Sequence, residues 1–383
     1  MMDSVVEGDR VEAAVLDEDP LALLDDYDFE LPESHIAQAP VQERESARLL
    51  VLDRSSGRIL APDEDQRIRD LPRWLRAGDL LVVNATRVLP ARLIGRKASG
   101  GAAEALLLGP EPPSDARSET SDYRALVKCT GRIREGLSLS FGHDLDLSAT
   151  LVAIHDRGEV TLRFEAGVDP YTHGEAPLPP YIRREGDASS AEDLARYQTV
   201  YAREPGAIAA PTAGLHFTDA LFDRLRDQGV GVAEVVLHVG AGTFRPLDAK
   251  AMRSGRLHQE NFELPSSTVD AIAKTRASGG RVVAVGTTTA RVLESQVGED
   301  GQLRPGTGTT DLFIRPGARP FQVVDALLTN FHLPRSSLLL LVAAFVGRRP
   351  LLNAYEYAIR QGFRFYSYGD AMLLVPNDEH GQR

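Results

Sequence analysis

The sequence contains very little cysteine and no long apolar run, and both shortages narrow the class of protein. Cys129 is the one cysteine among 383 residues, which excludes a disulfide framework and a cysteine-based zinc site and is typical of a reducing compartment. The longest strongly apolar run, Leu338 to Val346, spans nine residues and is too short to cross a bilayer. The first residues are acidic where a secretory signal would be basic. We therefore expect a cytoplasmic protein that does not span a membrane.

The chain also lacks a net positive charge, because its formal charge is −12. Twelve acidic residues and one arginine lie within residues 1–33, so the rest of the chain is close to neutral. Affinity for a polyanion follows the local field and not the total charge, so a nucleic-acid partner is not excluded. Residues 1–24 show no clear periodicity, and we predict a mostly disordered acidic tail there.

The periodicity of the remaining chain indicates two kinds of structure. Between about residues 92 and 164 short strand-like runs alternate with glycine-containing turns, which is typical of a small barrel or sandwich. The flanking regions alternate strands with helical segments, including a helix that Thr218 caps and Gly229 ends. The sequence predicts a discontinuous α/β domain over residues 25–90 and 177–383, with an all-β barrel inserted at 91–176. We expect a loop over residues 298–310.

Four expected strands of the α/β part end in small or polar residues. They cover residues 80–83, 232–237, 281–285 and 326–328, and they run into Asn84, His238, Gly286 and Thr329. Ligands of open α/β sheets bind outside the carboxyl ends of the strands. One such end could be an ordinary strand–loop boundary, but the four together predict a shared ligand site.

Histidines are concentrated in these polar segments. Four of the nine lie in or near them, namely His216, His238, His258 and His332. Imidazole can act as a general acid or base near neutral pH or as a metal ligand. No HExxH or CxxC spacing accompanies them, so we expect no metal site. A structural hydrogen-bonded role is the alternative for each histidine.

Two glycine-rich segments resemble nucleotide-binding loops only in part. Gly240-Ala241-Gly242 begins like a dinucleotide fingerprint, but Arg245 stands where GxGxxG requires glycine. The segment 286–290 lacks the lysine of a Walker A loop, although its threonines suit a pocket for a ribose or a carboxylate. The small residues of 206–217 would let the backbone approach a planar ligand closely.

Basic residues gather in three places, around residues 87–97, 124–134 and 183–184. Nearby tyrosines at 181, 197 and 201 could stack bases while the cations hold phosphates. The alternative is that these clusters are solvated surface.

Taken in order, these segments resemble the S-adenosylmethionine:tRNA ribosyltransferase-isomerases of queuosine biosynthesis over residues 27–373. The matching segments are 28–32 with 36–38, 78–92, 177–182, 197–202, 209–217, 237–244, 285–288, 329–334 and 367–372. Some positions depart from the family pattern: Ala85 replaces an asparagine, Ser254 with Gly255 replaces an Asp-His pair, and Glu175-Ala176 and Gln259 also differ. These departures bear on the substrate preference more than on the class of reaction.

The resemblance implies transfer and isomerisation of the ribosyl part of S-adenosylmethionine onto 7-aminomethyl-7-deazaguanine at the tRNA wobble position. The products would be epoxyqueuosine-tRNA, adenine and methionine. S-adenosylmethionine would be consumed as a substrate, with no resident cofactor, and tRNA bearing the precursor base would be the partner of a monomer. The alternatives are an S-adenosylmethionine-dependent RNA methyltransferase, which would normally show a glycine-rich loop after its first strand, and a non-catalytic RNA-binding module.

Such a reaction requires a base that removes a proton from the ribose carbon attached to sulfur, and a donor that assists the departure of adenine. The candidate acids and bases are His216, His238, His332 and Glu260. The candidate residues for binding S-adenosylmethionine and the base are Asn84, Arg87, Tyr201, Pro211, Thr212, Gly214, Gly240, Gly242, Thr243, Thr287, Thr288, Asn330, Tyr368 and Asp370. The candidate residues for binding tRNA are Arg92, Arg96, Lys97 and Arg183.

Overall fold

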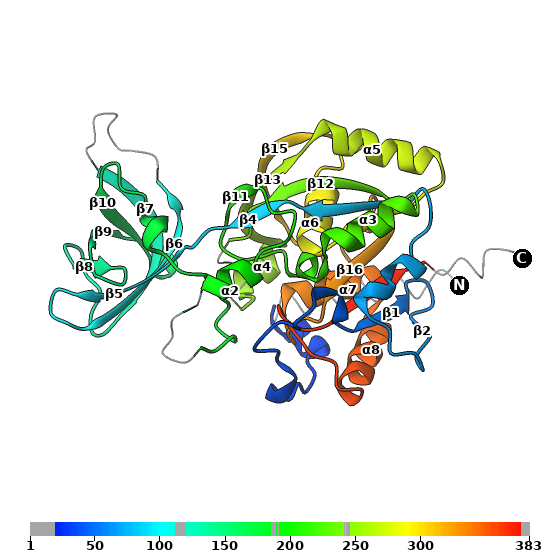
Figure 1. The fold of residues 1–383 in the computed structure, drawn as a ribbon, viewed down its shortest axis with the longest axis horizontal. Coiled ribbons are helices and arrows are strands. Elements are labelled where there is room, and N and C mark those ends of the chain that lie inside the picture. Colours follow the sequence, from blue (N-terminus) through cyan, green and yellow to red (C-terminus); the bar gives the residue numbers. More distant parts are fainter. Residues whose placement is uncertain are drawn as a thin grey trace, which may run out of the picture.

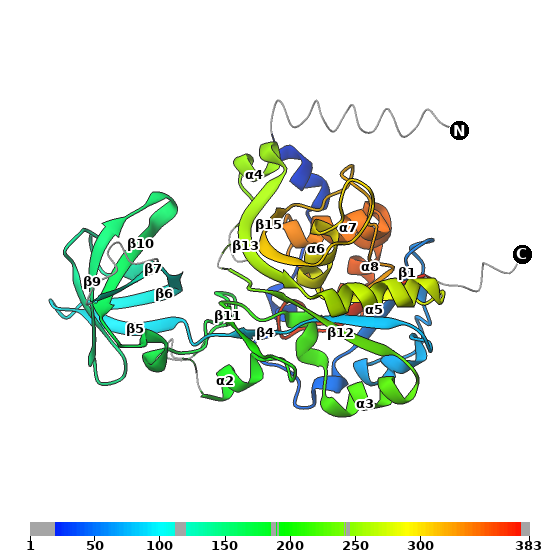
Figure 2. The same cartoon turned by 90° about the horizontal axis from the view of Figure 1, so that it is seen from above.

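A computed structural model describes residues 20–111, 120–184, 189, 191–240, 242 and 246–376. Within these ranges the chain forms a nine-stranded mixed sheet, covered by helices on both faces, and a six-stranded closed barrel (Figure 1). The barrel stands to one side of the sheet domain, as the view in Figure 2 also shows. The fold class predicted from the sequence, an α/β domain with an inserted β-barrel, is confirmed.

Four parallel strands form the centre of the sheet. The strands in spatial order are β12 (Gly231–Leu237), β3 (Leu80–Asn84), β14 (Val282–Val285) and β16 (Ala326–Asn330). Each pairs in parallel with its neighbour, so the four polar ends predicted to form a site do lie at one edge. Most of their residues are buried apolar side chains, as expected for parallel strands covered on both faces, but the first four residues of β12 are exposed or half-buried.

Antiparallel and edge strands extend the sheet on both sides. They are β13 (Arg256–Leu264) and β15 (Gly306–Leu312) beyond β12, and β17 (Ala371–Val375), β1 (Leu49–Asp53) and β2 (Ile59–Leu60) beyond β16. Because β17 runs antiparallel to β16, with Ala371 opposite Asn330, residues 366–370 reach the same edge as the four polar ends.

Two hydrophobic layers hold the helices against the sheet. One face carries α5 (Ser266–Ala277), α6 (Thr287–Ser295), α7 (Ser337–Val346) and α8 (Arg348–Arg360). The other face carries α3 (Asp219–Asp227), whose Leu221, Phe222 and Leu225 are buried, and the 3-10 helices Ile68–Arg73 and Thr212–His216. Thr218 caps α3 and Gly229 follows it with φ +86°, as predicted. Of the two short helices, α2 (Ala191–Arg196) lies outside these layers, whereas α4 (Ala249–Ser254) buries Met252 in the first of them.

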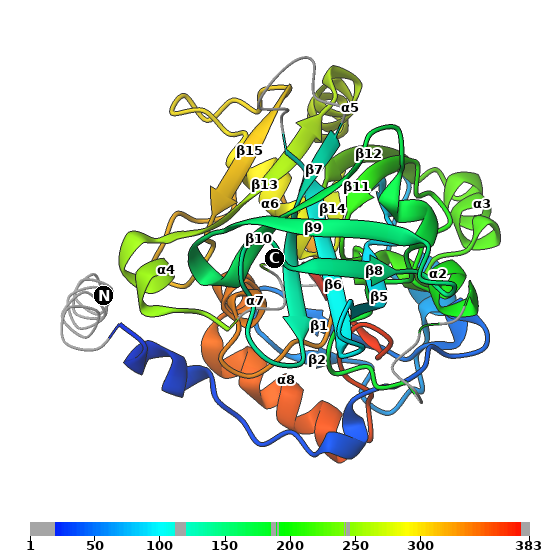
Figure 3. The same cartoon turned by 90° about the vertical axis from the view of Figure 1, so that its left-hand side faces the viewer.

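The inserted barrel has its own core. Its strands are β5 (Arg92–Lys97), β6 (Ala102–Pro110), β7 (Thr120–Cys129), β8 (Ser138–Phe141), β9 (Leu147–Ile154) and β10 (Glu159–Glu165). Alternate residues point inward, and Leu93, Phe141 and Leu162 are fully buried. Figure 3 looks at the barrel from the side away from the sheet. The chain enters the barrel through β4 (Thr86–Val88), and after leaving it returns to pair with β4 through β11 (Glu204–Ala207).

The first helix of the described residues lies at the predicted boundary between the tail and the α/β domain. A 3-10 helix covers Ala22–Tyr27, and Leu24 is only 3% exposed within the main core. Residues 1–19 of the predicted acidic tail lie outside the described residues. The predicted limits of the α/β and barrel segments stay predictions.

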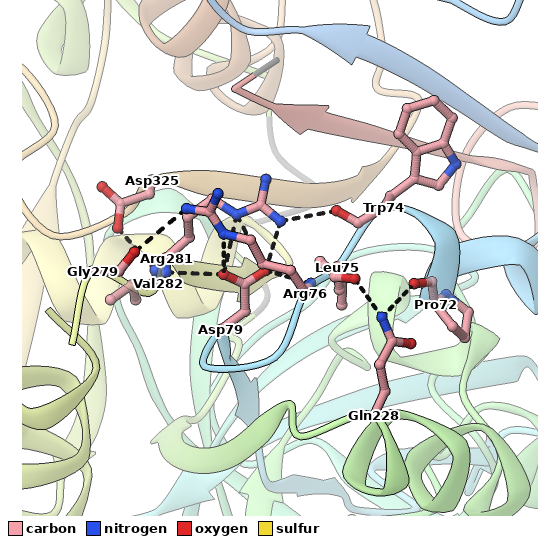
Figure 4. Close-up of polar contacts among 10 residues, drawn as sticks. All are labelled: Pro72, Trp74, Leu75, Arg76, Asp79, Gln228, Gly279, Arg281, Val282 and Asp325. Carbon is pink, nitrogen blue, oxygen red and sulfur yellow. Dashed lines mark hydrogen bonds and ion pairs between the residues drawn. The ribbon is translucent and has the colours of Figure 1, made fainter. Parts of the chain in front are cut away.

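The carboxyl ends of β12, β3, β14 and β16 form what we call the polar edge. A buried ion pair joins two strands at the opposite end of the sheet (Figure 4). Asp79, just before β3, accepts hydrogen bonds from the Arg281 guanidinium at 2.6 to 3.2 Å and from the Arg281 backbone N–H at 3.0 Å. Arg281 also donates to the Trp74 carbonyl. Asp79 is 1% exposed and Arg281 8%, so this pair joins the start of β3 to the start of β14 away from solvent.

Within the described residues no single helix is long and apolar enough to cross a bilayer; α7 and α8 pass that test only as a pair bent by 114°. The apolar residues of α7 are buried in the core instead.

Candidate active site

His238 follows β12 and is held from two sides. Its Nδ1 lies 2.8 Å from the Thr86 hydroxyl, which also lies 3.5 Å from the Glu204 carbonyl oxygen. Because the single hydroxyl proton of Thr86 can be donated to Glu204, Nδ1 of His238 can carry the ring proton and donate to Thr86. Nε2 is then the unprotonated nitrogen, which is the form a general base requires.

Gly206 supports the other side of the His238 ring. A Cβ at this glycine would lie 2.7 Å from the ring atoms Cε1 and Nδ1, and its backbone has φ +152°. Burial lowers the pKa of His238, and the nearby Glu204 carboxylate opposes that shift. The imidazole is therefore neutral at pH 7 and able to accept a proton.

Asn84 ties the strand ends together. Its Nδ2 donates to the Leu237 carbonyl at 3.0 Å and to the Thr288 hydroxyl at 3.2 Å, and its Oδ1 accepts from the N–H groups of Thr86 and Leu237. Both amide donors are used, so this fully buried side chain positions β3, β12 and the start of α6 relative to one another. Thr287, also predicted, is 6% exposed in the first turn of α6.

The segment of small residues, 206–217, crosses this edge from β12 to β16. Its Ile208 N–H donates to the Val239 carbonyl, and Ala213 lies against Gly286 at the start of α6. Pro211 and Thr212 begin the 3-10 helix Thr212–His216, which packs on β16. The segment therefore links the His238 end of the edge with the His216 end.

His216 lies in a second polar group at the end of β16. The Asn330 Nδ2 lies 3.3 Å from its Nε2 and donates to the Tyr366 carbonyl at 2.9 Å. Burial lowers the pKa of His216 to about 3, with further lowering by Arg364 and Arg44. His216 is therefore neutral at pH 7.

Several buried polar atoms near His216 have no hydrogen-bond partner among the described residues. They are Oδ1 of Asn330 and the hydroxyls of Thr199, Tyr201 and Tyr368. Gly214 makes room for one of them, since a Cβ there would lie 1.9 Å from the Tyr201 hydroxyl. Buried polar groups in proteins are normally hydrogen-bonded, so this concentration is typical of a site that receives a polar ligand.

Glu260 and Gly240 form a third group beside β12. Glu260 is 7% exposed; its Oε1 accepts from the Gly240 N–H at 3.1 Å, and its Oε2 pairs with Nη1 of Arg291. Gly242 lies against the His258 ring, where a Cβ would be 2.7 Å from Cδ2. Thr243 lies outside the described residues.

Other predicted residues lie apart from these groups. His332 hydrogen-bonds Thr329 at 2.8 Å, and burial lowers its pKa to about 3. Thr329 and Asn330 point to opposite faces of the sheet, so the contacts of His332 and His216 are on opposite sides. Asp370 accepts hydrogen bonds from the backbone N–H groups of Arg48 and Arg364 and connects the chain before β1 and β17.

The predicted tRNA-binding residues differ in their surroundings. Arg92 pairs with Glu104 at 3.0 Å, whereas Arg96 and Lys97 donate to the backbone carbonyls of Gly100 and Thr130. Arg183 is exposed 3.9 Å from Glu33. Arg87, on β4, is exposed and makes no ion pair with a described residue.

Sequence reasoning missed the residues that support the candidate histidines and Glu260. These are Thr86, Gly206, Arg291, Arg44 and Arg364. For Arg291 the sequence did contain a signal of a buried, paired side chain. It lies one helical turn after Thr287, among the apolar residues Ala290, Val292 and Leu293, where an unpaired arginine would cost free energy. Within the described residues no three His, Cys, Asp or Glu side chains gather as a metal site.

Comparison with known proteins identifies the family. The sequence profile described as "Queuosine biosynthesis protein" matches residues 24–374. The chain is 47% identical over 374 residues to an S-adenosylmethionine:tRNA ribosyltransferase-isomerase from a Caulobacter species, over 94% of this chain and 98% of the relative. It is 50% identical over 360 residues to the enzyme of the same name from an Azoarcus species, over 93% and 98%.

A solved structure agrees with these matches. The crystal structure of S-adenosylmethionine tRNA ribosyltransferase from Thermotoga maritima is 36% identical, with a TM-score of 0.51, over 91% of this chain and 100% of that chain. The resemblance and the enzyme class predicted from the sequence are thus confirmed. The chain belongs to the S-adenosylmethionine:tRNA ribosyltransferase-isomerase family of queuosine biosynthesis.

Proposed function

We propose that the polar edge of the sheet is where this chain carries out the reaction of its family. That reaction moves the ribosyl part of S-adenosylmethionine onto 7-aminomethyl-7-deazaguanine in tRNA, isomerises it to epoxyqueuosine, and releases adenine and methionine. The observation that supports this location is the arrangement around His238, a neutral imidazole oriented by Thr86 at the carboxyl end of β12. A sulfonium makes the neighbouring carbon–hydrogen bond acidic enough for such a base.

In this proposal Nε2 of His238 takes the proton from the ribose carbon attached to sulfur. Adenine then leaves, and the amine of the tRNA base displaces methionine. His216 acts as a neutral hydrogen-bonding group and not as a cationic acid, because its pKa of about 3 leaves it unprotonated at pH 7. The hydroxyls of Tyr201 and Tyr368, which have no partner among the described residues, suit the polar edges of a heterocyclic base or ribose.

The proposed tRNA contact combines the exposed face of β4 with the barrel. Arg124 and Arg163 pair with Glu111 and Asp122, so their charges are largely neutralised. Arg87, Arg96 and Lys97 have no acidic partner among the described residues and are the better candidates for phosphate contacts. We also propose a cytoplasmic location, because the substrate is tRNA. That the protein is a monomer stays a prediction.

Product analysis tests this function. The protein is incubated with S-adenosylmethionine and tRNA that carries the precursor base, and nucleosides and small molecules are measured by mass spectrometry. Free adenine, methionine and epoxyqueuosine are expected in equal amounts. S-adenosylhomocysteine with a methylated nucleoside would instead indicate a methyltransferase, and binding of tRNA without any product would indicate a non-catalytic module.

A further inference from the structure

A pocket of about 460 Å³ lies beside the polar edge, lined in part by Glu260 and Gly242 of the third group. It is bounded by α4, the start of α7, Arg291 of α6 and the first half of β13. There β13 departs from regular pairing: five residues, Arg256 to Glu260, lie opposite three residues, Thr310 to Leu312, on β15. The extra residues of this bulge, among them His258, form part of the pocket wall.

The deep end of the pocket holds a buried guanidinium that is only partly paired. Arg291 is 5% exposed; its Nε donates to the Leu312 carbonyl at 3.1 Å and its Nη1 to Glu260. Its Nη2 has no acceptor among the described residues. A buried cationic donor without an acceptor costs free energy, so the position favours a ligand that brings an anionic oxygen.

The remaining wall carries both signs of charge and an apolar strip. Lys250, Arg256 and Arg291 are matched by Asp248, Glu260 and Asp311, so the formal charges cancel. Such a balance suits a zwitterion better than a phosphate chain, which would require excess positive charge. Leu247, Leu257 and Leu338 supply the apolar contact that a short thioether side chain requires.

We infer that this pocket binds the methionine end of S-adenosylmethionine, with Arg291 receiving the α-carboxylate. The carboxylates of Glu260 and Asp311 face the α-ammonium, and the leucines contact the carbon chain next to sulfur. In this assignment Arg291, and not Thr287 or Thr288, binds the carboxylate of the methionine end. The identity of the ligand rests on the proposed function.

The pocket is directly connected to the proposed general base. Gly240, two residues after His238, donates its N–H to Glu260, and the His238 N–H donates to the Asn261 carbonyl on β13. A methionine group held against Arg291 therefore leaves its sulfur and the attached ribose carbon on the His238 side. The same contact fixes the position of the loop that carries the base.

The test compares ligands with and without the carboxylate. For the wild type, we expect S-adenosylmethionine to have a KM about 10- to 100-fold below that of its decarboxylated analogue, since a charged hydrogen bond is lost. Arg291→Met should raise the KM for S-adenosylmethionine by a similar factor and leave that for the analogue unchanged. Arg226→Met, on the exposed side of α3, is the matched control and should change neither value.

Removal of Arg291 leaves the buried carboxylate of Glu260 without its cationic partner and can destabilise the fold. A second variant therefore keeps this ion pair intact. Leu338→Trp fills the pocket from α7 without touching the ion pair, and it should weaken binding of L-methionine by at least 10-fold in calorimetry. Equal KM values for both substrates in the wild type, or unchanged methionine affinity in Leu338→Trp, would overturn the assignment. If the wild type releases no adenine, the proposed function fails, whereas methionine binding still tests the pocket by itself.

Discussion

The Thr86 hydroxyl lies 2.8 Å from Nδ1 of His238, although the two residues are 152 positions apart in the chain. They meet because β4 continues from β3, which pairs with β12 immediately before the histidine. The contact fixes the ring orientation and the nitrogen that carries the proton. An imidazole placed in this way is prepared for proton abstraction before the substrate binds.

The first prediction concerns this hydrogen bond. Thr86→Val keeps the shape of the side chain but removes the oxygen, so the tautomer of His238 is no longer selected. We expect kcat for adenine release to fall about 10- to 100-fold, a part of the full contribution of general base catalysis. Thr86→Ser retains the hydroxyl and should stay within a factor of a few of the wild type. Equal rates in the valine and serine variants would remove Thr86 from the mechanism.

The second prediction concerns the basic residues of β5. The side chains of Arg96 and Lys97 make hydrogen bonds to backbone carbonyls and lack acidic partners among the described residues, so their charges are available to phosphates. The double variant Arg96→Gln, Lys97→Gln should raise the KM for tRNA and reduce the salt dependence of binding by about one unit of slope for each lost contact. Filter binding at several salt concentrations measures this slope.

The paired Arg163 supplies the control for that experiment. Its guanidinium makes two hydrogen bonds to Asp122 at 2.8 Å, so Arg163→Gln should change the salt slope less than the β5 double variant does. An unchanged slope in the β5 double variant would place the tRNA elsewhere on the surface.

The third prediction is a loss of stability at acidic pH. Burial lowers the pKa of His332 from its ordinary value of 6.5 to about 3, so the unfolded chain binds a proton below pH 6.5 that the folded chain does not. The free energy of unfolding should therefore fall as the pH decreases from 6.5 towards 3, by about 1.4 kcal/mol per pH unit for this histidine.

Urea unfolding of His332→Asn measures that contribution. Between pH 6.5 and 5 the variant should show a shallower loss of stability than the wild type, because the titrating group is gone. A slope equal to that of the wild type would contradict the burial argument.

The fourth prediction separates stability from catalysis. Asp79→Asn removes the charge that compensates buried Arg281 at the end of the sheet away from the site (Figure 4). We expect the free energy of unfolding to fall by about 3–5 kcal/mol, as is usual when one partner of a buried pair is lost. At a temperature where the variant is folded, kcat for adenine release should equal that of the wild type. A large loss of kcat with unchanged stability would be the contrary result.

The strand ends were predictable because each is a local pattern, an apolar run followed by polar or small residues. That parallel pairing would bring Asn84, His238 and Asn330 to one edge follows from the topology of an α/β sheet. The loop predicted for residues 298–310 was wrong at its end, since β15 begins at Gly306. Gly306 and Gly308 lack strand preference, and β15 forms there through its antiparallel pairing with β13.

Partners distant in the chain were not predictable. The sequence near Glu260 contains nothing that indicates its pairing with Arg291, because the two residues meet only when α6 packs on β13. His332 shows the opposite error. It lies among motif residues and was a candidate acid or base, yet its hydrogen bond is to Thr329 on the other side of the sheet from His216.

The rate of adenine release in a single turnover of His238→Gln tests the central claim most directly. Excess enzyme is mixed with S-adenosylmethionine and precursor-bearing tRNA, and the melting temperature of the variant is measured to confirm its fold. If Nε2 of His238 is the base, release should slow by about 100-fold or more while tRNA affinity is unchanged. Release within a few-fold of the wild type would contradict the account.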